Sequence, residues 1–281
     1  MKNNENILHA TIVLYNNIPV LLEKAIDSFL NTQLDVKLYL IDNSETDELK
    51  YLADFDERIE YIFNGKNLGF GAAHNIALQK SIDDGVPYHL VLNPDVYFER
   101  GVVEELLEYM QNNGDVANVM PQVYYPDGRI QRHCKMLPTP FDLIIRRFFP
   151  VKSIINRMNE KFELHLSGYN QVMNIPFLAG NFMLLRTKCL KEVGLFDENI
   201  FMYLEDTDLN RRIHRKYNTI FYPKVTIVHE YAKESYVNKK LLIYHIKSAI
   251  YYFNKWGWFF DKERKKINTN LDKYINNMEI I

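Results

Sequence analysis

The sequence predicts an α/β protein with a mostly parallel central sheet flanked by helices, and three observations indicate that class. Short apolar runs that suit buried strands alternate with segments of helical spacing through residues 7–111. Polar residues follow the ends of these runs rather than interrupt them. The 281-residue chain is 47% hydrophobic and 14% aromatic, which is enough for one large domain or two smaller ones.

The first part of the chain alternates regularly between strands and helices. The segment Val20–Asn31, for example, spaces Leu22, Ile26 and Phe29 along one face of a helix. Strand–helix–strand steps of this kind build a parallel sheet through right-handed crossovers. We expect strands at 7–15, 36–41, 59–63 and 88–92, helices at 20–31, 72–82 and 102–111, and a helix or turn after the second strand.

The fourth strand ends in a pattern that matters for function. Its run His89–Leu92 is apolar enough to be covered on both faces, and Pro94 ends it because proline has no N–H for the ladder. Asp95 therefore stands just beyond the carboxyl end of a central strand, where open α/β sheets bind ligands. A carboxylate there suits a divalent cation; the alternative is that Asp95 only caps the following turn.

Other polar residues follow the neighbouring strands. Tyr15, Asp42 and the loop Asn67–Gly71 should meet Asp95 at the carboxyl edge of the sheet. A crevice of carboxylate, amides and a glycine loop at a helix start suits a nucleotide. The loop lacks the third glycine of a dinucleotide fingerprint, and the chain has no Gly-Lys-Ser/Thr phosphate loop, which disfavours an NAD-dependent oxidoreductase.

The second half resumes the sheet. We expect segment 201–213 to begin extended and to end as a helix that starts at Asp206 or Thr207. Further strand pieces are expected at 116–120, 122–125, 177–186, 220–222 and 225–229, with a turn at 125–128.

Glu205, Asp206 and Asp208 crowd three carboxylates into four positions. Carboxylates held close together raise one another's pKa, and a raised pKa suits a general base near neutral pH. The alternative is an ordinary capped helix whose acids pair with nearby arginines. His229 closes the last strand and is a metal or phosphate ligand, a core histidine or a plain strand end.

Two segments mix basic and apolar residues: Phe141–Phe149 and Lys239–Lys266. Aromatics beside lysines suit a bilayer interface. The alternative for the first segment is a helix on the core with its arginines in solvent. For the second it is a helix pair packed on the domain or on a second copy of the chain, as in a homodimer.

Composition excludes several classes. The net charge of −2 argues against broad nucleic-acid binding. Cys134 and Cys189 match no metal-binding or redox spacing, which favours a reduced, cytoplasmic setting. The N-terminus lacks the apolar core of a signal peptide, and no window of about 20 apolar residues predicts a transmembrane helix.

The ordered set of motifs resembles an inverting family 2 glycosyltransferase with the GT-A fold. The matching parts span residues 7–230: the strand end at Thr11–Asn16, Asp42-Asn43, Asn67–Asn75, Asn93-Pro94-Asp95, Phe177–Asn181, Gly194–Asp197, Tyr203–Asp208 and His229. Asn93-Pro94-Asp95, and Gly128–Gln131 leading to Pro138-Thr139, most resemble bacterial rhamnosyltransferases of surface polysaccharide synthesis.

The resemblance implies a role for each matching residue. Asp206 would be the catalytic base with Glu205 beside it, and Gly180 and Asn181 would line the sugar and acceptor pocket. Asn93 replaces the first aspartate of the family's Asp-X-Asp motif, so one carboxylate faces the cation. The residues that would bind the donor are Tyr15, Asp42, Asn67, Gly69, Asn93 and Asp95. Asp95 and His229 would bind the metal, Mg²⁺ or Mn²⁺.

The implied reaction moves a sugar from a nucleotide donor to a hydroxyl of a glycan or polyprenyl-linked acceptor. The resemblance favours dTDP-rhamnose as donor and leaves UDP-sugars open; a catalytically silent nucleotide-sugar-binding subunit is the alternative. Residues 1–230 would form the GT-A domain, with 129–170 as a helical acceptor-side or membrane-facing insertion. Residues 231–281 would be a basic, aromatic helical extension, which with Phe141–Phe149 would dock a cytoplasmic enzyme on the inner leaflet.

Overall fold

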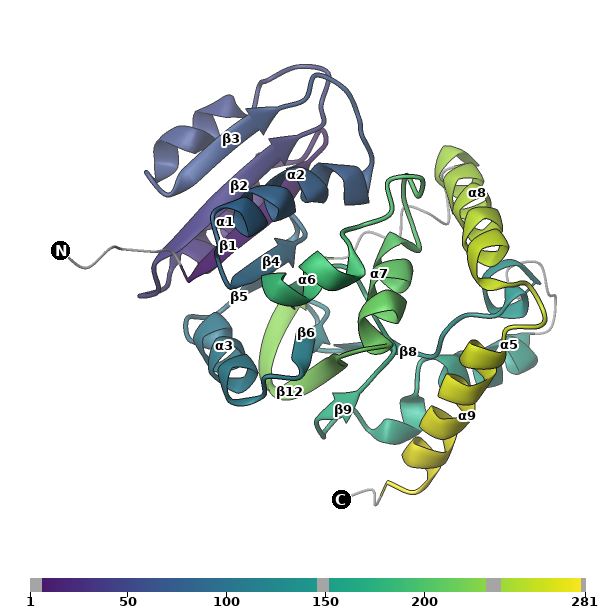
Figure 1. The fold of residues 1–281 in the computed structure, drawn as a ribbon. Coiled ribbons are helices and arrows are strands. Elements are labelled where there is room, and N and C mark those ends of the chain that lie inside the picture. The colour runs from purple at the N-terminus through teal and green to yellow at the C-terminus, as the bar shows by residue number, and fades with distance from the viewer. Residues whose placement is uncertain (1–6, 146–151, 231–238, 279–281) are drawn as a thin grey trace.

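A long mixed sheet with helices on both faces forms the centre of the computed structural model, which describes residues 7–145, 152–230 and 239–278 (Figure 1). The strands are β1 (Leu8–Leu14), β2 (Val36–Asp42), β3 (Ile59–Phe63), β4 (Tyr88–Leu92), β5 (Val96–Phe98), β6 (Val116–Tyr124), β7 (Ile130–Gln131), β8 (Cys134–Lys135), β9 (Met173–Asn174), β10 (Phe177–Leu178), β11 (Phe182–Arg186) and β12 (Asn218–His229). The helices are α1 (Pro19–Leu30), α2 (Phe70–Asp83), α3 (Val102–Asn112), α5 (Lys152–Phe162), α6 (Thr187–Val193), α7 (Glu205–His214), α8 (Lys239–Trp256) and α9 (Lys262–Asn276). Single turns are η1 (Lys50–Phe55), η2 (Phe141–Ile145) and η3 (His165–Ser167).

The sheet order is β3-β2-β1-β4-β11-β6-β12-β5. The strands from β3 to β4 are parallel, as the alternating sequence predicts. β11 then runs antiparallel to both β4 and β6, and β12 runs parallel to β6, so the second half is mixed. The chain enters β11 from the edge where β4 ends: the Asn93 N–H donates to the Asn181 carbonyl at 3.0 Å. This antiparallel return brings the loop before β11 beside Asp95.

The strands alternate between two apolar layers because successive side chains point to opposite faces. On β4, Leu90 and Leu92 pack in the cluster that contains α1 and α3. Val91 packs instead with Leu78 of α2 and Leu209 of α7. The sheet is therefore covered on both faces, which accounts for its nearly continuous apolar runs.

Three local expectations are wrong in detail. β6 runs unbroken through Pro121, and β12 is one strand with an irregularity between Tyr222 and Thr226. Residues before α7 are not extended, because Tyr203 and Leu204 have φ of 68° and 70° in the left-handed region. The helix consequently begins at Glu205.

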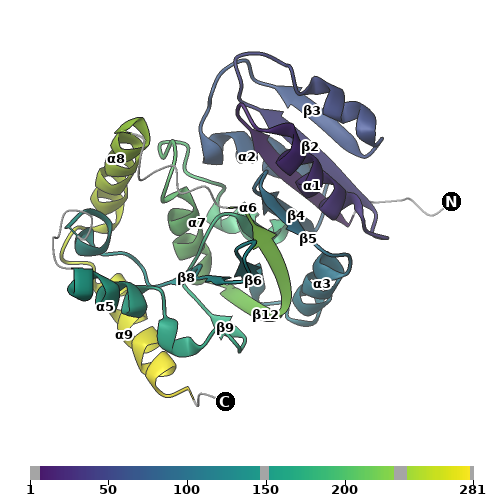
Figure 2. The same cartoon turned by 180° about the vertical axis from the view of Figure 1, so that it is seen from behind.

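The C-terminal helices pack on the domain, which is one of the alternatives left open by the sequence. Ala249, Tyr252 and Phe253 of α8 are fully buried in a cluster with Leu204. α8, α9 and α5 lie together at the end of the molecule opposite β3 in both views (Figures 1 and 2).

A buried cation joins these helices to α7. The Arg211 guanidinium, 1% exposed, forms ion pairs of 2.8 Å with both Asp261 and Glu263. It also lies over the Trp256 ring at 4.2 Å. Burying a charge is costly unless it is paired and hydrogen-bonded, so α7 and the C-terminal helices depend on each other.

Residues 129–170, which the sequence predicts to be a helical insertion, contain two short strands, β7 and β8, as well as α5 and two helical turns, and Phe162, Leu164 and Tyr169 of this range pack in the core. Part of the basic and apolar segment predicted there, Arg146–Phe149, lies outside the described residues. Within the described part of the chain, none of the helices has the length and apolarity that crossing a bilayer requires.

Candidate active site

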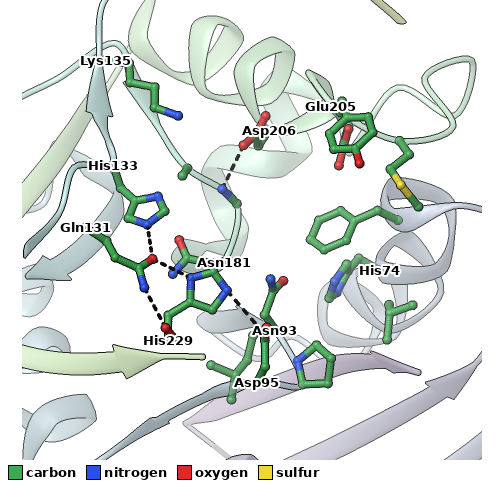
Figure 3. A pocket seen from close by; sticks show the side chains of 18 of the residues that line it. His74, Asn93, Asp95, Gln131, His133, Lys135, Asn181, Glu205, Asp206 and His229 are labelled. Carbon is green, nitrogen blue, oxygen red and sulfur yellow. Dashed lines mark hydrogen bonds and ion pairs between the residues drawn. The ribbon is translucent and has the colours of Figure 1, made fainter. Parts of the chain in front are cut away.

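A cavity of about 1480 Å³ opens at the carboxyl edge of the sheet, where the loops after β1 and β4 and the last residue of β12 meet the start of α7 (Figure 3). It gathers almost all of the residues predicted for the site: Tyr15, Asn67, Gly69, Asn93, Asp95, Gly180, Asn181, Glu205, Asp206 and His229. Asp42 does not line the cavity. It is fully buried, and its two carboxylate oxygens accept hydrogen bonds from the Ser44 N–H and the Tyr61 hydroxyl. Its neighbour Asn43 lines the wall, so a donor-binding role for Asp42 stays a prediction.

The loop before α2 is closed by its own side chains. The Asn67 side-chain oxygen accepts the Gly69 N–H at 2.9 Å. Gly69 has φ of +86°, and a Cβ built there would lie 2.2 Å from the Phe201 carbonyl oxygen. Only glycine allows this approach, which docks the loop onto the segment leading to α7.

Asp95 and His229 face each other across the end of the sheet, with 3.3 Å between Asp95 Oδ1 and His229 Nε2. Gln131 sets the orientation of the imidazole: its amide N–H donates to the His229 carbonyl at 2.6 Å, and its Oε1 lies 2.9 Å from His229 Nδ1. Because Oε1 can only accept, His229 carries a proton on Nδ1, and its Nε2 faces Asp95.

A carboxylate oxygen and an imidazole nitrogen that face each other at 3.3 Å are the ligand types that suit a bound cation. Asp95 Oδ1 is buried and has no hydrogen-bond partner within the described residues. The part of the chain that the structure describes contains no group of three or more His, Cys, Asp or Glu side chains that could bind a metal. A magnesium-like ion fits such a sparse pair, because it keeps several waters and often takes substrate phosphates as further ligands.

Asp206 is held by the backbone. The Gly180 N–H donates to Asp206 Oδ2 at 2.9 Å, and the Thr207 N–H donates to Oδ1 at 2.6 Å. A Cβ added to Gly180 would lie 3.0 Å from the Asp206 Cβ and 3.3 Å from Oδ2. The glycine therefore lets a main-chain donor approach the carboxylate directly.

The two adjacent acids differ in what surrounds them. Burial raises the pKa of Asp206, while Lys135 and the two backbone N–H groups oppose the rise. Burial, and then the charge of Asp206, raise the pKa of Glu205 well above its usual range. Glu205 Oε2 has no hydrogen-bond partner in the described part of the chain. Hydrogen bonds to a carboxylate favour its charged form, so Asp206 is the ionised member and Glu205 holds the proton.

Several cavity residues were missed from the sequence. Gln131, His133 and Lys135 line it, together with Arg129, Ile130 and Arg132 of the same segment. The His133 Nε2–H donates to Gln131 Oε1 at 2.9 Å, and burial holds the pKa of His133 well below its usual range. Polar side chains at 131, 133 and 135 recur with the period of two of an extended segment, and this signal was present in the sequence. His74 of α2 also lines the cavity and had no such signal.

Solved structures share this architecture. A mannosyltransferase from Pyrobaculum calidifontis, solved with GDP-Man and Mn²⁺, has a TM-score of 0.60 at 14% identity and covers 96% of this chain and 70% of its own. The structure of GalNAc-T7 with UDP, GalNAc and Mn²⁺ has a TM-score of 0.59 at 15% identity, and the match covers 82% of this chain but only 45% of that one. These likenesses show that the chain has a fold of the GT-A type.

The chain belongs to Glycosyl transferase family 2, whose profile matches residues 10–194. It is similar to the N-acetylglucosaminyl-diphospho-decaprenol L-rhamnosyltransferase of Mycobacterium tuberculosis, with 25% identity over 81% of this chain and 77% of the relative. It is also similar to the rhamnosyltransferase WbbL of Escherichia coli, with 27% identity over 84% of this chain and 86% of the relative.

Gly180→Ala tests the close approach to Asp206. The added methyl group would push the carboxylate off its position, and misplacement of a reacting group by about 1 Å lowers turnover on the order of 100-fold. We expect that loss in kcat, measured as release of nucleoside diphosphate, with a thermal midpoint near that of the wild type.

Gly114→Ala is the matched control, because a Cβ there meets nothing within 4 Å. It should retain wild-type kcat. Equal kcat in the two variants would contradict the positioning role assigned to the Gly180–Asp206 contact.

Proposed function

We propose that this glycosyltransferase moves a hexose, with rhamnose from dTDP-rhamnose favoured, to a hydroxyl of a glycan or lipid-linked oligosaccharide, and that it inverts the anomeric centre. The single observation that carries the proposal is the Asp206 carboxylate, oriented by two backbone N–H groups beside the cavity. The named rhamnosyltransferase relatives, which align over most of their length, support the choice of sugar.

The geometry supports a single displacement. The acceptor hydroxyl gives its proton to an Asp206 oxygen as the hydroxyl oxygen attacks the anomeric carbon, and the bond to the diphosphate oxygen breaks on the opposite face. General-base help of this kind is worth roughly 10²–10⁴-fold. Asp206 and the Asp95–His229 pair lie at opposite sides of the cavity in Figure 3, which leaves room between base and leaving group.

Asp95 and His229 would hold Mg²⁺ or Mn²⁺ together with the donor phosphates. When bound, the ion supplies positive charge to the departing nucleoside diphosphate. Gln131 keeps the imidazole turned toward Asp95. Asn93 adds no second carboxylate to the pair, and its backbone N–H donates to the Asn181 carbonyl. The chain's own contribution is thus one carboxylate and one imidazole.

A membrane surface is the second part of the proposal. The aromatic residues of α8 that pack on Leu204 are unavailable to lipid, but the turn between α8 and α9 is not. Phe259 is 75% exposed and Phe260 is 98% exposed. Exposed lysines follow at Lys262, Lys265 and Lys266. Two free phenyl rings beside a basic helix start suit the interface of an anionic bilayer, where a polyprenyl-linked acceptor would lie.

Asp206→Asn tests the base. The amide cannot accept the hydroxyl proton, so we expect kcat to fall by about 10²-fold or more while nucleotide binding stays near wild type. In the wild type, kcat should fall as acid protonates Asp206, at a pH above that of an ordinary aspartate, because burial raises its pKa. Asp54→Asn, at an exposed position of η1, is the control. Near-wild-type turnover in Asp206→Asn would sink the assignment.

Asp95→Asn tests whether Asp95 and His229 bind the cation. We expect UDP or dTDP to raise the thermal midpoint of the wild type only when Mg²⁺ or Mn²⁺ is present, since a ligand that binds the folded state stabilises it. Chelation with EDTA should abolish the shift, and Asp95→Asn should lose most of it. A metal-dependent shift that survives in Asp95→Asn would show that the ion binds elsewhere.

Flotation with vesicles containing phosphatidylglycerol tests the surface. Each phenyl ring contributes roughly 1.5–3 kcal/mol when buried, so Phe259→Ser with Phe260→Ser should reduce binding by about tenfold or more. Tyr274→Ser, at a half-exposed ring on α9, is the control. Flotation of the double variant at the wild-type level, or no wild-type binding, would contradict this surface.

A further inference from the structure

Besides Asp95 Oδ1 and His133 Nδ1, three almost fully buried residues of the cavity have side-chain polar atoms without hydrogen-bond partners in the described part of the chain. These atoms are both ring nitrogens of His74, both side-chain amide atoms of Asn181, and Oε2 of Glu205. All three residues line the same cavity, and their exposed fractions are 0%, 5% and 6% respectively. Figure 3 shows them around the space between Asn93 and the start of α7.

Orphaned polar atoms of this kind need an explanation. A buried donor or acceptor without a partner costs about 1–3 kcal/mol, and folded proteins keep few of them. The Asp95–His229 pair is a separate group with its own use for a cation. A ligand with several hydroxyl groups would satisfy His74, Asn181 and Glu205 at once.

The three groups are electrically neutral. Burial lowers the pKa of His74 to about 3, so its ring offers one N–H and one lone pair. The Asn181 amide both donates and accepts. Glu205, as the protonated member of its pair with Asp206, can donate through its carboxyl proton. Together they complement the donor and acceptor capacity of sugar hydroxyls.

The surroundings of this cluster are apolar. The His74 ring lies 4.3 Å from the ring of Phe70 and 6.1 Å from that of Phe196. A Cβ built on Gly71 would meet the Phe196 side chain at 2.8 Å and Glu205 at 3.6 Å, so α2 and α7 close together here. The cationic side chains of the cavity wall are Arg129, Arg132 and Lys135, which belong to the β7–β8 segment.

We propose that His74, Asn181 and Glu205 recognise the hydroxyl groups of the transferred sugar, and that this sugar carries no charge. The inference rests on the proposed function and names the residues that select the donor. A sugar carboxylate would be placed in an apolar wall among neutral groups, where burial without a cationic partner is costly. Neutral hexoses and 6-deoxyhexoses satisfy the cluster; hexuronic acids do not.

The test compares sugar binding with nucleotide binding in the same variant. Calorimetry with Mn²⁺ measures Kd for UDP and dTDP, then for UDP-glucose, UDP-galactose, UDP-N-acetylglucosamine and dTDP-rhamnose. His74→Phe keeps a buried ring but removes both nitrogens. We expect its Kd for the preferred nucleotide sugar to rise about tenfold or more, with the Kd for the free nucleotide within about twofold of wild type.

Further variants keep the test decisive if His74→Phe does not fold. Asn181→Leu should show the same selective loss. Glu205→Gln, which can still donate, should bind the nucleotide sugar better than Glu205→Met does. His214→Phe is the matched control, because His214 lies at the end of α7 outside the cavity and contacts the Thr219 hydroxyl, which also lies outside it.

Two nucleotide sugars with the same nucleobase, one with a neutral sugar and one with a charged sugar, test whether the site excludes a charged sugar. We expect UDP-glucose to bind more tightly than UDP-glucuronic acid, or dTDP-glucose more tightly than dTDP-glucuronic acid if thymidine is preferred. Tighter binding of the uronic acid donor, or equal sugar affinity in the wild type and the cluster variants, would overturn the inference and leave the transferase intact. Binding of no nucleotide at all would instead refute the proposed function.

Discussion

Two left-handed residues, Tyr203 and Leu204, determine where α7 begins and therefore where Asp206 points. Residues other than glycine rarely adopt this backbone conformation, which costs about 1–3 kcal/mol per residue, so contacts with neighbouring residues must stabilise it. Leu204 is packed among Ala249, Tyr252 and Phe253 of α8, and the Ser248 hydroxyl donates to the Met202 carbonyl at 2.7 Å. The C-terminal helices contribute no residue to the cavity wall, yet they stabilise the turn that presents the base.

The same turn explains how adjacent acids come to have different roles. Asp206 meets two backbone N–H donors because Gly180 can approach it, whereas Glu205 is turned toward the apolar wall by Gly71 and Phe196. Identical chemistry in neighbouring positions is thus divided by the backbone into a carboxylate and a carboxylic acid. The Asp95–His229 pair is also oriented by a neighbour, because Gln131 contacts both Nδ1 and the main-chain carbonyl of His229.

Much of the fold and most of the candidate site could be predicted from local sequence patterns. Parallel strands covered on both faces have a strong apolar signal, and polar residues at their ends must meet at one edge, which brought Asp95 and Asn67 together correctly. The left-handed turn, the unbroken strand through Pro121 and the fully bonded Asp42 could not be predicted, because each depends on contacts distant in sequence. His74 was missed for the same reason. A single histidine on an apolar helix face gives no sign of ligand binding until the residues on the opposite wall of the cavity are known.

The contacts between α7 and the tail constrain how such enzymes could be recombined. Asp208 accepts the Trp256 indole N–H at 2.8 Å and pairs with Lys255 at 2.8 Å, while Arg211 is buried against Asp261 and Glu263. A chimera that exchanged the C-terminal helices alone would leave Arg211 buried without its ion-pair partners, and Asp208 would keep only its pair with Arg212 at 2.8 Å. Exchange of α7 together with residues 239–278 would instead transfer both sides of this interface as one unit. For chimeras between relatives, the useful boundary therefore lies before Tyr203 and not after His229.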